Sequence, residues 1–158
     1  LVDTWNSIER YFLENYKGVS VDTFHILMTG YSYDPDEDSE FLWDKAYKII
    51  SSTQFIRKII LERFEFHNCT FHNLSINEIH LINWDVILDE PENQIGWLAN
   101  DEYRPNDLKK IYIETVTIDF LQFNGLPPDN PEATIDEYRQ IYRRKYGDDF
   151  IFEIGQLS

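Results

Sequence analysis

The chain has 158 residues, of which 29 are Asp or Glu and 14 are Lys or Arg, so its formal net charge is −15 at pH 7. A charge of this sign repels nucleic acid and anionic membranes and attracts basic partners. The hydrophobic content of 42% and the aromatic content of 16% argue against a disordered chain. The length predicts a single domain over residues 1–158, built around one core.

The acidic residues are segregated along the sequence. Residues 18–44, 64–103 and 111–138 contain no lysine and no arginine. We therefore expect the folded domain to carry broad faces of one sign. Faces of this kind favour fast association with a basic protein.

The sequence up to residue 63 predicts three helices and one strand. Apolar residues recur at helical spacing from Trp5 to Tyr16, with Gly18 as the stop signal. Residues 23–29 form a short apolar run that fits a strand or a helix, and a strand is favoured. Ser39 is a good cap for a helix that runs to Ile50, and a further helix is expected over 53–63.

The middle of the chain has an internal repeat. Over residues 64–88, pairs of apolar residues spaced by two recur every five residues. This pattern resembles the pentapeptide-repeat proteins, and the resemblance implies a four-sided β-solenoid. An ordinary β structure also fits, with antiparallel strands that turn at His67-Asn68, His72-Asn73 and Asn77-Glu78.

The C-terminal third predicts strands and one helix. Residues 89–107 have the composition of a loop, and 109–123 alternate with many β-branched residues, as strands do. Asn130-Pro131 opens a helix that ends at Gly147, and 149–154 form a last strand. Together the elements predict an α+β fold, a single domain with helices packed on a mostly antiparallel sheet.

Two clusters contain residue types that bind metals. Asp34, Asp36 and Asp38 have the spacing of the first half of an EF-hand loop, but Ser39 and Lys45 stand where that loop needs Gly and Glu. A solvated acidic loop is therefore favoured over a calcium site.

The second cluster contains the single cysteine. His67, Cys69, His72 and His80 match no common zinc spacing, so a buried Cys69 thiol is the better interpretation. The glycine-rich and nucleophile motifs of common enzymes are absent. We expect no enzyme, no metal and no cofactor, and a small metal-dependent enzyme using Cys69 and nearby His stays as an alternative.

The acidic and aromatic surface resembles, at the level of the class, the bacterial immunity proteins that neutralise polymorphic or contact-dependent toxins. The resemblance implies a cytoplasmic inhibitor that binds a basic toxin, often a nuclease, and no membrane or nucleic acid. A DNA mimic that inhibits a nucleic-acid-binding protein is the neighbouring alternative. No apolar run in the sequence is long enough to span a membrane.

Two segments combine carboxylates with aromatic anchors, and we expect them to contact the partner, although ordinary solvated loops have the same composition. The first contributes Tyr31, Tyr33, Asp34, Asp36, Glu37 and Asp38, and the second contributes Asp89, Glu90, Glu92, Trp97, Asp101, Glu102 and Tyr103.

Overall fold

The computed structural model of the chain describes residues 2–27, 35–62, 70–82, 86–88, 96–114, 118–120 and 131–155. Three helices, one 3-10 turn and seven strands lie in these ranges. In chain order they are α1 (Val2–Asn15), β1 (Ser20–Leu27), α2 (Pro35–Ser52), β2 (Phe55–Glu62), β3 (Ile76–Ile82), β4 (Val86–Leu88), η1 (Gly96–Ala99), β5 (Lys110–Glu114), β6 (Ile118–Phe120), α3 (Pro131–Tyr146) and β7 (Ile151–Ile154).

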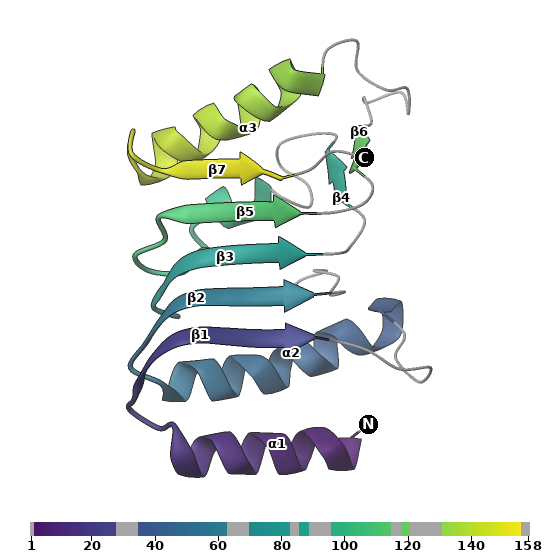
Figure 1. The fold of residues 1–158 in the computed structure, drawn as a ribbon, viewed down its shortest axis with the longest axis vertical. Coiled ribbons are helices and arrows are strands. Elements are labelled where there is room, and N and C mark those ends of the chain that lie inside the picture. The colour runs from purple at the N-terminus through teal and green to yellow at the C-terminus, as the bar shows by residue number, and fades with distance from the viewer. Residues whose placement is uncertain are drawn as a thin grey trace.

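The main sheet has five strands in the order β1-β2-β3-β5-β7, and every neighbouring pair is parallel (Figure 1). Strands β4 and β6 form a separate parallel pair. The predicted antiparallel α+β sheet is therefore wrong, and the arrangement is of the α/β type. Because parallel neighbours cannot be joined by a tight turn, the chain must return between strands to the end of the sheet where the strands begin. Helix α2 lies in the return after β1, and α3 lies in the return before β7.

Three of the strand segments share one pattern of buried residues. Apolar side chains are buried at relative positions one, four and six, which are Ile56, Ile59 and Leu61 in the β2 segment, Ile76, Ile79 and Leu81 in β3, and Leu108, Ile111 and Ile113 at β5. The strand segments of leucine-rich repeats have the same spacing, and their parallel strands also follow one another in chain order. The likeness is one of spacing and strand order.

The core lies between the helices and the face of the sheet that carries these buried side chains. In the view of Figure 1, α2 passes behind the lower strands and α3 lies beside β7. Trp43 of α2 is buried and donates its indole N–H to the Thr70 carbonyl at 2.8 Å. At the other end, Tyr142 of α3 stacks on Phe152 with ring centroids 5.4 Å apart. Aromatic and branched side chains thus fill the space between the layers.

Residues 55–62 form strand β2, where the sequence predicted a helix over 53–63. Its apolar residues at 56, 59 and 60 have helical spacing, but it is rich in isoleucine and lies inside the sheet as β2. Parallel central strands are buried and lose the clean alternation that marks a half-exposed strand. Pairing with β1 and β3 therefore decided the conformation.

The five-residue repeat does not form a solenoid coil in the described residues. Strand β3 runs straight through Asn77-Glu78, so the turn predicted there is wrong. The apolar pairs at 74–76 and 79–81 lie in line along one segment and do not stack as sides of a coil. The turn at His72-Asn73 is confirmed, with Asn73 at a φ of 67°, and His67-Asn68 lies outside the described residues.

The elements with strong local signals agree with the prediction. The first and last helices match α1 and α3, and the final strand matches β7. Helix α2 begins at Pro35, before the predicted cap at Ser39. Segment 109–123 contains two strands, β5 and β6, that belong to different sheets. Helices α1 and α3 end shortly before Gly18 and Gly147, and α3 begins at Pro131, which are clear stop and start signals.

Candidate functional site

The residues that alternate with the buried ones form the second face of the sheet. Because the strands are parallel and in register, these residues align in rows across the strands. Among the described residues no helix covers this side, and we call it the open face. Its rows are Thr23, Lys58, Glu78, Lys110 and Ile151, then His25, Ile60, His80, Tyr112 and Glu153, then Leu27, Glu62, Ile82 and Glu114.

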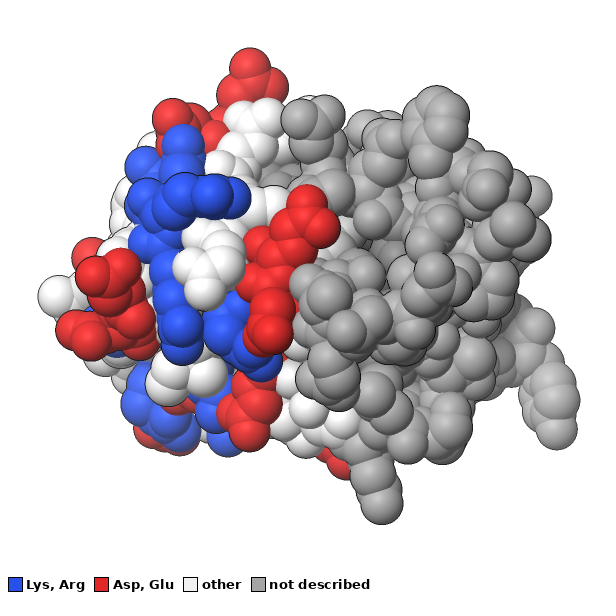
Figure 2. Space-filling model, turned by 90° about the horizontal axis from the view of Figure 1, so that it is seen from above, with Lys and Arg blue, Asp and Glu red and all other residues white. Residues whose placement is uncertain are grey.

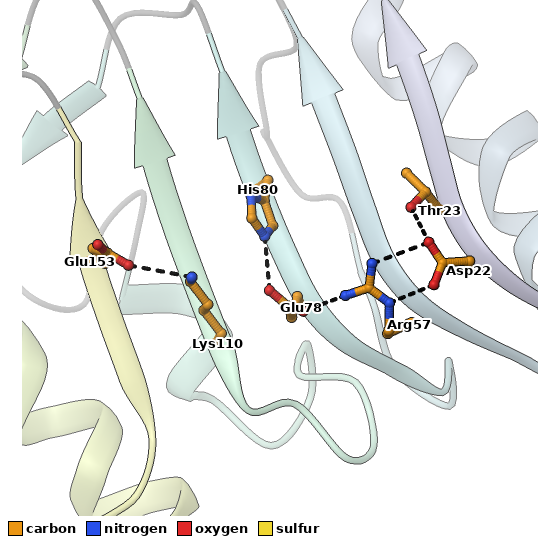
Figure 3. A network of polar contacts seen from close by, with 7 residues as sticks. All are labelled: Asp22, Thr23, Arg57, Glu78, His80, Lys110 and Glu153. Atoms are coloured by element: carbon orange, nitrogen blue, oxygen red, sulfur yellow. Dashed lines mark hydrogen bonds and ion pairs between the residues drawn. The ribbon is translucent and has the colours of Figure 1, made fainter.

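A network of ion pairs crosses the open face (Figure 3). Arg57 donates from Nε to Asp22 Oδ1 at 2.6 Å and from Nη1 to Glu78 Oε2 at 2.9 Å. The Glu78 carboxylate also lies 3.1 Å from His80 Nε2. The contacts join three strands and fix the guanidinium between two carboxylates, an arrangement that favours bidentate pairing.

A second pair continues the network to the other edge of the sheet. Lys110 on β5 lies 3.3 Å from Glu153 on β7, and its ammonium is 5.7 Å from the Tyr112 ring centroid. Beside it, the rings of His80 and Tyr112 have centroids 5.2 Å apart. Charged groups therefore lie on all five strands of the open face, and His80 and Tyr112 place two aromatic rings near its centre.

The pKa values of the network follow from these contacts. The hydrogen bonds from Arg57 and Thr23 lower the pKa of Asp22 to about 2, and Asp22 in turn raises the pKa of Arg57. Burial lowers the pKa of His80, whose side chain is 14% exposed, against the opposing effect of Glu78. At neutral pH, Asp22 and Arg57 are charged and His80 is a neutral hydrogen-bonding group.

Burial acts in the opposite direction on Glu78. Burial raises its pKa, but the hydrogen bond from His80 and the charges of His80, Lys110 and Arg57 outweigh this effect and lower the pKa overall. We assign the negative charge to Glu78 and a neutral imidazole to His80, because Arg57 at 2.9 Å already stabilises the carboxylate. The imidazole then donates a neutral N–H to Glu78.

Strand stacking mixes the charges that are segregated along the sequence. Arg57 pairs with Asp22 from one base-free stretch and with Glu78 from another. The prediction of broad single-sign faces is therefore wrong for the open face, because its rows take residues from five distant segments. Lys and Arg also gather in a band on the side of the molecule seen in Figure 2, with Asp and Glu beside it.

Several predicted contact residues lie outside the described residues, namely Tyr31, Tyr33, Asp34, Asp89, Glu90 and Glu92. Asp36 and Glu37 lie in the first turn of α2, where Asp38 is half-buried. Trp97 lies in η1, before the exposed Asp101 and Glu102 and the half-buried Tyr103.

The described parts of the two predicted contact segments lie near opposite ends of the strands. Helix α2 has 18 residues, so its two ends are about 27 Å apart. The carbonyl of its last residue, Ser52, accepts the Gly18 N–H near the N-terminal end of β1. The Tyr103 carbonyl accepts the Phe71 N–H just before β3, at the same end of the strands. Asp36 to Asp38 are at the far end of α2, about 27 Å from the end that lies near Tyr103.

Asp101 is also engaged within the protein. Its carboxylate lies 2.8 Å from Lys145 and 3.0 Å from Arg104. The hydrogen bond from Lys145 is the main cause that lowers its pKa. Two cations already compensate this charge, so Asp101 attracts a basic partner less than a free carboxylate does.

The predicted metal-binding residues are not brought together in the described part of the chain. His67 and Cys69 lie outside it, His72 is exposed before β3, and His80 bonds to Glu78 on the open face. Among the described residues, no three His, Cys, Asp or Glu side chains are grouped as a metal site requires. None of the described helices has the length and apolarity needed to cross a membrane.

Comparison with protein-family models, with curated proteins and with solved structures finds no match for this chain. The open face was also missed by reasoning from the sequence. The available signal was the set of polar residues between the buried ones, such as Arg57 and Lys58 before Ile59 and Glu78 before Ile79. Such residues form a site only when the strands are placed in register.

Proposed function

We propose that this protein binds a basic protein partner through the open face and inhibits it, as an immunity protein inhibits its toxin. The observation that carries the proposal is a parallel sheet whose described helices cover one face only. Parallel sheets normally have both faces covered. A second face that is held ready by fixed ion pairs, and is not covered by the described helices, is a natural place for a partner to dock.

The chemistry of the open face favours a folded protein as the partner. Ile60, Tyr112 and Ile82 lie between the charged groups, so apolar contact and ion pairing are both available. Aromatic and aliphatic anchors surrounded by polar groups are typical of protein interfaces. The net charge of −15 favours a basic partner through long-range attraction.

The DNA-mimic alternative is less well supported. A mimic of the phosphate backbone needs spaced carboxylates without cations between them, since duplex DNA carries regularly spaced negative charges. Arg57, Lys58 and Lys110 lie in the central strands of the open face. A nucleic-acid-binding protein would meet these cations at the centre of its contact.

The test is direct binding to the product of the neighbouring reading frame, if that product is basic. We expect co-expression to yield a complex and to restore growth if the neighbour is toxic. Raising the salt from about 0.05 M to about 0.5 M should weaken the affinity steeply, because exposed charges are screened. An affinity that does not change with salt contradicts the electrostatic basis of the proposal.

Charge reversal locates the contact. The double variant Glu114→Lys, Glu153→Lys changes exposed positions of the open face and should weaken binding at least about tenfold, through loss of complementarity. The matched control is Asp44→Lys, Glu137→Lys, which makes the same change of net charge on exposed positions of α2 and α3. Equal losses in the two variants would assign the effect to net charge and overturn the role of the open face.

A further inference from the structure

The two edges of the main sheet differ in how their backbone groups are satisfied. At the β7 edge, Nε of Arg139 donates to the Phe152 carbonyl at 3.4 Å and Nε of Arg143 approaches the Phe150 carbonyl at 3.5 Å. Both carbonyls face away from β5, because Ile151 and Gly155 make the bonds to that strand. Helix α3 therefore covers this edge with arginine side chains, a common protection against further strand pairing.

Among the described residues, no strand pairs with the outer side of β1, and α1 lies beside this edge (Figure 1). Ile151 donates its N–H to the Lys109 carbonyl, so the residues in its row direct their backbone groups towards the preceding strand. The rows of Ile151 and Glu153 begin in β1 at Thr23 and His25. Thr23, His25 and Leu27 therefore direct their backbone N–H and C=O groups outward. No other described strand pairs with them.

A groove of about 390 Å³ runs along this edge. Its lining includes the five consecutive residues 23–27, which belong to both faces of β1, so the groove follows the strand edge itself. On the opposite side α1 contributes Trp5, Ile8 and Phe12, which are spaced as one face of a helix, and Tyr16 follows directly after the helix. The Phe12 and Phe24 rings meet across the groove with centroids 6.0 Å apart.

The groove fits an extended segment better than it fits a second copy of this chain. An unpaired strand edge beside an apolar groove is the geometry of β-strand addition, in which main-chain bonds give affinity and pockets accept alternate side chains. In a second copy, β1 would carry its own α1 along the same edge, and the two helices would collide as the strands approached. A segment outside a folded sheet has no such obstacle.

The charge of the groove indicates what the segment carries. Among the described residues that line the groove none is Lys or Arg, and the one titratable base is His25, which pairs with Glu62 at 2.7 Å. The exposed Asp22 lies next to the lining on the same strand. With a net charge of −15 behind it, this edge attracts a basic segment and repels an acidic one.

We infer that the β1 edge, together with α1, binds an extended basic segment of the partner as an additional strand, with alternate apolar side chains in the groove. The inference rests on the proposed function, which supplies the basic partner. About eight residues would match the length of β1. The partner would then be held at two places, its folded surface on the open face and this segment at the adjoining edge.

The first test uses synthetic peptides with the intact protein. An eight-residue peptide of alternating Val and Lys should bind at low salt in calorimetric titration. The same peptide with N-methyl groups on alternate amides loses one bonding edge and should bind at least about tenfold more weakly. A peptide with Glu in place of Lys should also bind more weakly. Equal binding of the N-methylated and unmodified peptides would overturn strand addition.

Two matched variants place the peptide. Leu27 lines the groove and is 51% exposed, and Ile151 is 49% exposed on the β7 edge. Leu27→Lys should weaken peptide binding at least about tenfold, whereas Ile151→Lys adds the same charge elsewhere and should have little effect. Equal effects would reject the groove as the site.

The remaining outcomes separate this inference from the proposed function. A partner complex that forms normally with Leu27→Lys, while no peptide binds, would reject the groove and keep the open face. If the peptide binds but no basic partner binds the open face, the groove is kept as a binding site and the proposed function is rejected. A dimer that Leu27→Lys dissociates and Ile151→Lys does not would show that the occupant is a second copy and would overturn the inference.

Discussion

The covered face and the open face of the sheet are built from alternate residues of the same strands, yet they are held by different forces. One residue of β3, Ile79, is fully buried in a row with Ile59 and Ile111. The next residue, His80, lies in a row with Ile60 and Tyr112 and takes part in the ion-pair network. The covered face is stabilised by removal of apolar surface from water, and the open face by charge pairs that remain partly hydrated.

The difference teaches where stability and recognition are located. Ion pairs as exposed as Asp22 and Arg57, at 72% and 43%, contribute little to folding. The same pairs hold the side chains of the open face in fixed positions and so reduce the entropy that a partner must remove on binding. The open face is therefore the part of the sheet that can vary without loss of the fold.

The largest effect is expected for a cavity in the covered face. Ile79→Ala should lower the free energy of unfolding by about 3 kcal/mol, because the site is fully buried between two isoleucine neighbours. The neighbouring His80→Ala should lower it by less than about 1 kcal/mol. Urea denaturation of both variants measures the contrast, and similar losses would contradict the division of roles between the two faces.

The next effect concerns pH and His80. Burial lowers the pKa of His80 in the folded protein below the ordinary value of 6.5. Below pH 6.5 the unfolded state therefore binds the proton first, so the stability falls as the pH drops towards the lowered pKa. Tyr112, Glu78, Lys58 and Lys110 are the groups that act on the imidazole.

Denaturation at several pH values measures this dependence. The slope attributable to one proton is at most about 1.4 kcal/mol per pH unit. The variant His80→Asn should remove the fall in stability that begins below about pH 6.5. A slope that persists in the variant would place its origin at another group.

The comparison of the faces also explains what the sequence could predict. Helices α1 and α3 were recognisable because caps and helical periodicity are local signals. Strand direction is not local, since the apolar pattern of β3 fits parallel and antiparallel neighbours equally well. The prediction of an antiparallel sheet assumed short turns, and the long returns through helices between strands were missed.

The open face was beyond local reasoning for the same reason. Arg57 meets Asp22 and Glu78 only after three strands from separate segments align in register. The acidic loops were conspicuous in the sequence because their charges are contiguous. A site formed across strands leaves single polar residues that resemble an ordinary solvated face.

A smaller effect is expected at the exposed end of the network. Asp22 has its pKa lowered to about 2 by Arg57 and Thr23. This depressed pKa contributes stability that is present above about pH 4 and is lost as the pH falls towards 2. In Arg57→Ala the pKa of Asp22, followed by carboxyl NMR titration, should rise towards 3.8. Arg57→Lys serves as the control and should keep part of the shift, and an unchanged pKa in the alanine variant would assign the shift to another group.

The smallest effect on stability is expected at the β7 edge. Arg139→Ala with Arg143→Ala removes two long hydrogen bonds to the Phe152 and Phe150 carbonyls, which should change the free energy of unfolding by less than about 1 kcal/mol. The same variant frees outward carbonyls on a strand edge, so it should self-associate more than the wild type in light scattering. Arg144→Ala, at an exposed position of the same helix, is the control. If the double variant stays as monodisperse as the control, the arginines do not protect this edge, and the proposed contrast with the open β1 edge loses its basis.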